Sequence, residues 1–78
     1  MRKMNRGDKA TEQARRFDFV RLMRAVGEHA AGAEGVVCDD ATVDEGWVII
    51  ELVDEEGRPR GVLDVDLSDL ELVQRHVT

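Results

Sequence analysis

The residues that could do covalent chemistry in this chain are one cysteine, Cys38, and two histidines, His29 and His76. A cysteine nucleophile needs a thiolate and an adjacent imidazole that acts as a base. Asp39 and Asp40 follow Cys38 directly, and negative neighbours disfavour the thiolate. No glycine-rich elbow accompanies the cysteine. We therefore interpret Cys38 as a structural residue, and we expect a protein that is not an enzyme and has no catalytic residues.

Carboxylates are the second group of side chains that could do chemistry, because hard cations bind where several of them converge. The candidates are Asp39, Asp40, Asp44 and Glu45, and the pair Asp64 and Asp66. Neither spacing matches a calcium-binding loop, and alternating acids are typical of a half-exposed strand. The histidines are far apart and lack partner cysteines for zinc. The sequence thus predicts no metal site and no cofactor.

Two basic regions could bind phosphates. The segment 57–61 is basic and flanked by glycines, but it lacks the lysine and the following helix of a phosphate-binding loop, and a hairpin tip explains it. Residues 1–33 carry a net charge of +4. The pI near 4.8 and the lack of an aromatic platform on the predicted strands disfavour direct binding of nucleic acid.

Length and composition limit the number of domains and the cellular compartments that fit this chain. At 78 residues, with 42% hydrophobic residues, the chain has room for one domain. A lone cysteine excludes an internal disulfide and fits a reducing compartment. The longest apolar run, residues 48–50, is far too short to cross a bilayer. We expect a cytoplasmic protein without a membrane partner.

The spacing of apolar residues predicts the element order α-β-β-β-α. Positions 19, 22, 23, 26 and 30 form one helical stripe, which predicts a long helix over residues 12–31 that begins after Thr11 and ends at Gly32. Phe17 lies off this stripe, on the polar arc. Valine, isoleucine and tryptophan predict strands over residues 36–43, 47–53 and 62–67.

The residues after the last predicted strand, Ser68-Asp69-Leu70-Glu71, match a capping box, which predicts a short C-terminal helix. We therefore expect an α+β fold in which one long N-terminal helix packs on a three-stranded antiparallel meander. Residues 1–9 would be a flexible basic arm, and residues 10–78 a single domain.

The register of the last two strands depends on the loop around residues 55–57, and two alternatives remain open. A three-residue bulged loop places Trp47, Ile49, Val53, Leu63 and Val65 on one face. A four-residue loop instead makes Val48, Ile50, Leu52, Leu63 and Val65 the core face and leaves Trp47 and Ile49 outside the core. In either register some apolar surface remains to be covered by another element, a second copy or a partner.

The charge is divided unevenly, because residues 34–78 carry a net charge of −10. Such an array of carboxylates can imitate a phosphate track and speed association with a cationic groove. We expect a non-enzymatic binding or inhibitory protein that engages a basic surface, including that of a nucleic-acid-binding protein. The residues expected to bind this partner are Asp39, Asp40, Asp44, Glu45, Asp64 and Asp66.

In its size, its acidity and its lack of a recognisable active site, the chain resembles the small stand-alone inhibitors that bacteriophages encode, including anti-CRISPR proteins. This resemblance implies competitive binding without catalysis. The alternative is a homodimeric structural or regulatory domain that pairs through an apolar second sheet face. Its contacts would be Phe17, Trp47 and Ile49.

Overall fold

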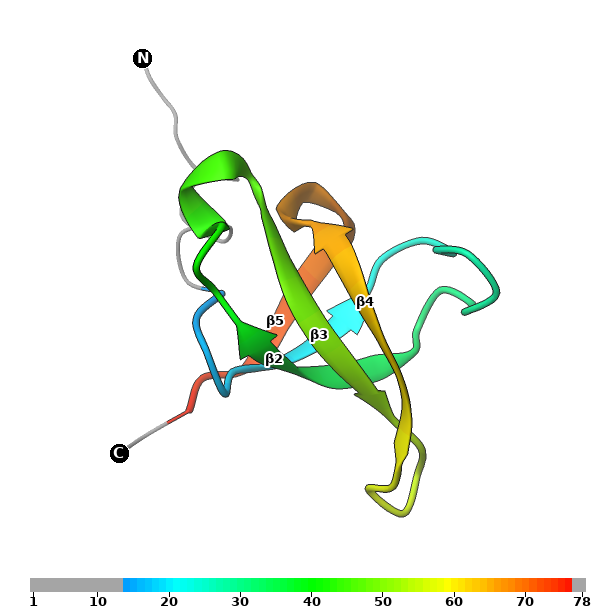
Figure 1. Ribbon diagram of the computed structural model, residues 1–78. Coiled ribbons are helices and arrows are strands. Elements are labelled where there is room, and N and C mark those ends of the chain that lie inside the picture. Colours follow the sequence, from blue (N-terminus) through cyan, green and yellow to red (C-terminus); the bar gives the residue numbers. More distant parts are fainter. Residues whose placement is uncertain (1–13, 77–78) are drawn as a thin grey trace.

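The computed structural model describes residues 14–76. The predicted basic arm over residues 1–9 and the predicted helix cap at Thr11 lie outside these residues. The described chain forms one five-stranded antiparallel sheet with the strand order β4-β3-β2-β1-β5 (Figure 1). Its elements are β1 (Phe19–Leu22), β2 (Glu34–Asp39), the 3-10 turn η1 (Val43–Glu45), β3 (Trp47–Val53), β4 (Pro59–Asp66), the 3-10 turn η2 (Leu67–Asp69) and β5 (Leu70–Gln74). The predicted α+β class and the α-β-β-β-α order are therefore wrong.

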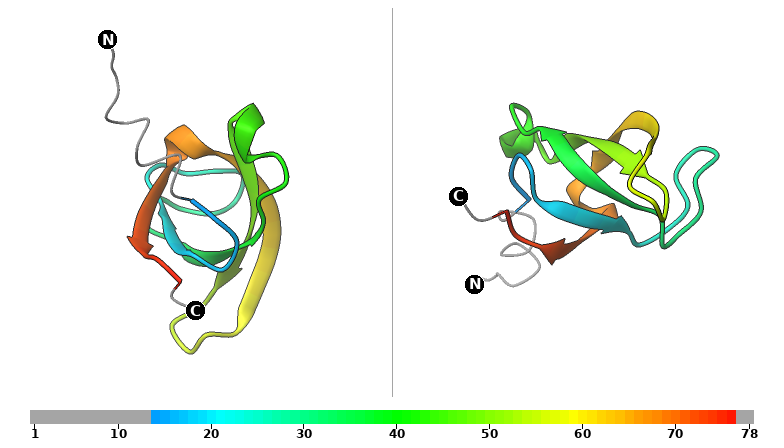
Figure 2. Two further views of the ribbon diagram at one scale, coloured as in Figure 1. Left: turned by 90° about the vertical axis from the view of Figure 1, so that its left-hand side faces the viewer. Right: turned by 90° about the horizontal axis from the view of Figure 1, so that it is seen from below.

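The sheet is rolled into a partly open barrel. β4 and β5 lie at opposite edges, yet only the three residues of η2 connect them. So short a connection requires the two edges to approach each other, and the end-on view in Figure 2 shows this curl. The backbone N–H of Leu67 donates to the Gly46 carbonyl at 2.9 Å, which holds η2 beside η1.

Alternate residues of each strand point into the barrel and form its core. On β3 the inward residues Val48, Ile50 and Leu52 are buried, whereas Trp47 and Ile49 point outward and are half-buried. The β3–β4 register pairs Ile50 with Leu63 and Val48 with Val65, which confirms the core face of the second alternative. The four-residue loop is wrong, because residues 54–58 connect the strands and the register shifts between Leu52 and Val53. The buried apolar residues are Ala14, Val20, Leu22, Val37, Val48, Ile50, Leu52, Val65, Leu67 and Leu70.

The long N-terminal helix predicted over residues 12–31 is absent from the described part of the chain. Residues 19–22 form β1 instead, and residues 23–33 form a loop. Val20 and Leu22 point inward, whereas Phe19 and Arg21 point outward. This period of two is typical of a strand, but the same residues also fit the helical stripe in the sequence. Gly27 and Gly32 adopt positive φ values of 58° and 94°, which suit turns rather than a helix.

The predicted C-terminal helix is also wrong. Of the capping-box residues, Ser68 and Asp69 lie in η2, whereas Leu70 and Glu71 begin β5. Leu70 and Leu72 lie opposite Leu22 and Val20 of β1, so they cover the same core. Glu71 points outward and lies opposite Arg21. Burial of both leucines against β1 outweighs the local helical preference, because packing commonly overrides propensity.

One buried carboxylate ties the two ends of the described chain together. Asp18 is 1% exposed, and it accepts hydrogen bonds from the backbone N–H groups of Arg15 (2.9 Å) and His76 (2.8 Å). Arg75 places a guanidinium nitrogen 3.7 Å from the same carboxylate. The neighbouring Phe17 has a φ of 77°, an uncommon value for a bulky residue. The turn before β1 is thus held by polar contacts that span the whole domain.

Gly35 allows β2 and β3 to cross closely. It is buried, and a Cβ atom at this position would overlap the backbone carbonyl of Glu51 and lie 2.9 Å from the Leu52 Cα. Only glycine fits without a backbone shift.

No helix within residues 14–76 is long and apolar enough to cross a membrane.

Candidate functional site

The six carboxylates predicted to bind a partner gather at one end of the sheet. β2 and β4 end here and β3 begins here, because neighbouring strands are antiparallel. The turns η1 and η2 lie at this end, at the top of Figure 1. The six residues are Asp39 at the end of β2, Asp40 just after it, Asp44 and Glu45 in η1, and Asp64 and Asp66 on β4. We refer to these six residues as the acidic end.

Two half-buried apolar side chains lie between these carboxylates. Ile49 on β3 is opposite Asp39 on one side and opposite Asp64 on the other. Trp47 is opposite Asp66. Residues directly opposite in an antiparallel pair have Cβ atoms about 4.5–5.5 Å apart. Asp39, Asp64 and Asp66 therefore share one outer surface with the apolar strip formed by Trp47 and Ile49.

The carboxylates of the acidic end are not neutralised by the arginines within residues 14–76. The arginine ion pairs there are Arg21 with Glu34 (3.0 Å) and Glu71 (3.2 Å), Arg24 with Asp69 (2.8 Å), Arg58 with Asp54 (3.3 Å) and Glu56, and Arg75 with Asp18 (3.7 Å). Across the part of the chain that the structure describes, no ion pair involves any of the six acidic-end residues.

Two of these carboxylates are oriented by backbone donors. The Ala41 N–H donates to Asp39 at 2.8 Å, and the Arg16 N–H donates to Asp40 at 3.1 Å. Each bond uses one oxygen and leaves the other available. Because backbone N–H groups are neutral, neither hydrogen bond supplies a counter-charge.

A seventh carboxylate, Asp69, lies beside the acidic end, and sequence reasoning missed it as a site residue. Together with Trp47, Asp64, Val65 and Asp66, it lines a hollow of about 320 Å³. The sequence assigned Asp69 to a helix cap, so nothing in the local pattern pointed to this position. Its pairing with Arg24 partly balances its charge.

The three predicted dimer contacts are not on one element. Trp47 and Ile49 share the outer face of β3. Phe17 lies in the turn before β1, where its ring centroid is 5.3 Å from that of His76. The guanidinium of Arg16 lies 5.0 Å from the centre of the Phe17 ring. Phe17 is 52% exposed, but it already has two partners.

The residues that could support catalysis or metal binding come from separate segments. Cys38 is half-buried on β2, His29 is in the loop of residues 23–33, and His76 follows β5. Within residues 14–76, no three His, Cys, Asp or Glu side chains are arranged to hold a metal ion.

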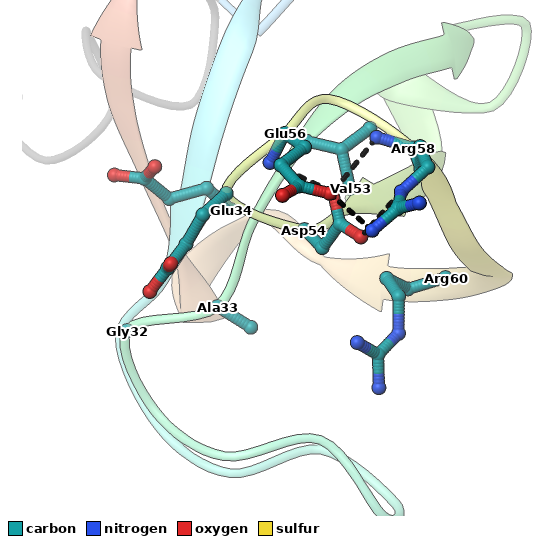
Figure 3. Close-up of a pocket in the computed structure, with 9 residues that line it drawn as sticks. Gly32, Ala33, Glu34, Val53, Asp54, Glu56, Arg58 and Arg60 are labelled. Carbon is teal, nitrogen blue, oxygen red and sulfur yellow. Dashed lines mark hydrogen bonds and ion pairs between the residues drawn. The ribbon is translucent and has the colours of Figure 1, made fainter.

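The opposite end of the sheet has a larger hollow of about 670 Å³, next to the β3–β4 hairpin (Figure 3). Its charges are largely satisfied internally. Asp54 accepts from the backbone N–H groups of Arg58 (2.9 Å) and Glu56 (2.8 Å), and also from the Arg58 side chain. The hydrogen bond from the Arg58 N–H is the main cause that lowers the pKa of Asp54. This group shapes the hairpin, so we do not assign a ligand to the hollow.

Comparison with protein families, with curated proteins and with solved structures gave no match for this chain.

Proposed function

We propose that this protein is a non-enzymatic binding protein whose acidic end engages a basic surface on a larger protein. The observation that carries the proposal is the set of six carboxylates on one end of the sheet, none of them ion-paired within the described residues. A basic partner would supply the missing counter-charges. Complementary charge also steers association and increases its rate.

The apolar strip supplies apolar contact area, which the carboxylates alone do not offer a partner. Trp47 is half-buried and borders the hollow that Asp64, Asp66 and Asp69 line. An arginine of the partner could lie against the indole and pair with these carboxylates, because guanidinium groups favour both arrangements. The proposed partner therefore presents arginine-rich surface, as nucleic-acid-binding proteins do. Small phage-encoded inhibitors, including anti-CRISPR proteins, are the functional class that this proposal suggests.

Self-pairing through Trp47 and Ile49 is less favourable than binding a basic partner. A second copy docked on this strip would bring its own Asp39, Asp64 and Asp66 against the same carboxylates. Like charges placed directly opposite each other destabilise a sheet contact. The arrangement thus favours a partner of opposite charge over a homodimer formed through this face.

A titration with a basic peptide tests the location of the binding surface. A ten-residue arginine peptide is added to the isotope-labelled protein, and amide chemical shifts are recorded at low and high salt. We expect shifts to concentrate at η1, at the start of β3 and at the end of β4, and to fade with salt because exposed charges are screened. Shifts spread evenly over all acidic residues would contradict the proposal.

A charge-reversal pair tests function with a matched control. Asp64→Lys with Asp66→Lys should weaken capture of the cellular partner about 2- to 30-fold at low salt and flatten the salt dependence, since each exposed pair contributes about 0.2–1 kcal/mol. Glu28→Lys with Glu55→Lys makes the same change of net charge away from the acidic end. If the two double variants bind equally well, net charge rather than the acidic end governs the interaction.

A further inference from the structure

The loop of residues 23–33 brings a cationic side chain to the candidate site. The Met23 N–H donates to the Asp69 carbonyl at 2.8 Å, which fixes the start of the loop beside η2. Where the loop returns to the sheet, the Leu22 N–H donates to the Ala33 carbonyl, also at 2.8 Å. The backbone therefore holds the loop next to η2 without any contribution from the side chain of Arg24.

Arg24 pairs from this position with a carboxylate beside the acidic end. Its Nε atom lies 2.8 Å from Asp69 Oδ1. Asp69 lines the hollow of about 320 Å³, which we call the Trp47 hollow, together with Trp47, Asp64, Val65 and Asp66. A guanidinium of the chain itself is therefore paired with a carboxylate of the hollow in which the proposed function places a guanidinium of the partner.

The two side chains of this ion pair differ in exposure. The side chain of Asp69 is 20% exposed, whereas that of Arg24 is 70% exposed. Asp69 belongs to η2 and lies between the buried residues Leu67 and Leu70, so the turn fixes its position. Arg24 lies largely in water, where an ion pair is weak and the released guanidinium is solvated. Arg24 is thus the partner that can leave.

We propose that Arg24 is an intramolecular competitor for the arginine of the basic partner, and that the partner's guanidinium replaces it on Asp69. This inference rests on the proposed function, because it concerns the regulation of the same site. A tethered guanidinium competes at a high effective concentration and lowers the affinity of every guanidinium ligand. An isolated arginine then loses its weak binding. A surface with several arginines also pairs with Asp64 and Asp66 and covers Trp47, so it stays bound.

The exchange involves the side chain of Arg24 and not the backbone of the loop. The hydrogen bond from the Met23 N–H to the Asp69 carbonyl does not depend on the guanidinium. We therefore expect the bound protein to have a released Arg24 side chain and an unchanged loop backbone. This combination distinguishes competition by one side chain from an opening of the whole loop.

Nuclear magnetic resonance of the Arg24 Nε–H group tests the exchange directly. The Asp69→Ala variant without peptide gives the reference signal of the released guanidinium. We expect the arginine peptide to move the Arg24 signal of the original protein to this reference position, together with the amide shifts at η1 and at the end of β4. The amide signals of residues 27–33 should stay in place. An Arg24 signal that does not move while the amides of the acidic end shift would overturn the proposal and leave the proposed function intact.

Two charge-matched variants measure the strength of the competition. Arg24→Gln and Arg60→Gln each remove one positive charge, but Arg60 lies at the opposite end of β4 and forms no ion pair within residues 14–76. At low salt, the dissociation constant of the arginine peptide should be about 1.4- to 5-fold lower for Arg24→Gln than for Arg60→Gln, since only the first variant removes a competing exposed ion pair.

Circular dichroism confirms that each variant is folded before the peptide is added. Equal dissociation constants for Arg24→Gln and Arg60→Gln would show that only net charge matters, and the proposed competition would be wrong. A lack of amide shifts at the acidic end, in the original protein and in both variants, would instead remove the proposed function and this inference with it.

Discussion

Replacement of Asp18 gives the sharpest test of how this small sheet is held together. Its carboxylate is 1% exposed and accepts two backbone hydrogen bonds, from Arg15 at 2.9 Å and from His76 at 2.8 Å. A hydrogen bond to a charged group contributes about 1.5–3 kcal/mol. Asp18→Ala removes both acceptors, which should lower the free energy of unfolding by about 3–6 kcal/mol.

That loss is as large as the whole stability expected of such a domain, about 3–5 kcal/mol. We therefore expect Asp18→Ala to be largely unfolded at 25 °C. Asp18→Asn is the more informative variant, because its amide keeps one oxygen acceptor and turns an N–H₂ group toward the other donor. We expect a loss of about 1–3 kcal/mol for Asp18→Asn.

Urea denaturation followed by far-ultraviolet circular dichroism measures the difference directly. Asp64→Asn is the matched control, because it removes the same charge from an exposed strand position and should change stability by no more than about 0.5 kcal/mol. If Asp18→Asn unfolds at the same urea concentration as the original protein, the buried carboxylate does not hold the two chain ends, and the reasoning fails.

Three further predictions follow from the core, the strand crossing and the hairpin. Gly35→Ala should destabilise the sheet by about 1–3 kcal/mol because its Cβ overlaps the Glu51 carbonyl, and unchanged stability in urea would refute the close crossing. Ile50→Val should cost about 0.5–1.5 kcal/mol, also measured in urea, and no loss would place Ile50 outside the core. The folded-state pKa of Asp54 is lowered, chiefly by the Arg58 N–H, so its stabilisation is present above the unfolded pKa of about 3.9 and is lost as the pH falls through the folded value. Carbon-detected NMR titration of Asp54 checks this, and a midpoint at or above the ordinary aspartate value would contradict it.

The strands in the middle of the chain could be predicted because their signals are local. The run of residues 47–53 is rich in valine and isoleucine and lies between two glycine-containing turns, and β3 has the predicted bounds. The sequence leaves the core face of β3 open, because the face depends on the loop length and on any bulge in the paired strand, and the register here shifts between Leu52 and Val53. The observed pairing of Ile50 with Leu63 decides it.

The first strand could not be predicted from the same kind of signal. β1 has four residues, and its period of two is too short to compete with an apolar stripe that matches a helix over twelve positions. The contacts that stabilise β1 come from residues distant in sequence, because Arg21 forms ion pairs with Glu34 of β2 and Glu71 of β5. Phe17 lies off the helical stripe, and this misfit argued against a regular helix in the segment.

The spatial grouping of the six carboxylates follows from the strand arrangement, whereas their role as a binding site stays a prediction. In an antiparallel meander the end of one strand lies beside the start of the next, so the grouping of Asp39, Asp44 and Asp66 did not depend on the wrong helices. Asp69 was missed because its place beside Trp47 depends on η2, which the sequence assigned to a helix. The burial of Asp18 was missed for a similar reason, since its partner His76 lies 58 positions away.

The pairing of β1 with β5 determines when this protein can fold during its synthesis. Arg21 and Glu71 are 50 positions apart, so β1 lacks one neighbour until the last strand has left the ribosome. Before that moment Val20 and Leu22 have no cover from Leu70 and Leu72. Closing so long a loop costs entropy before any contact rewards it, and such topologies fold in about milliseconds to seconds. Nascent chains should therefore be unable to complete the sheet until β5 has emerged from the ribosome.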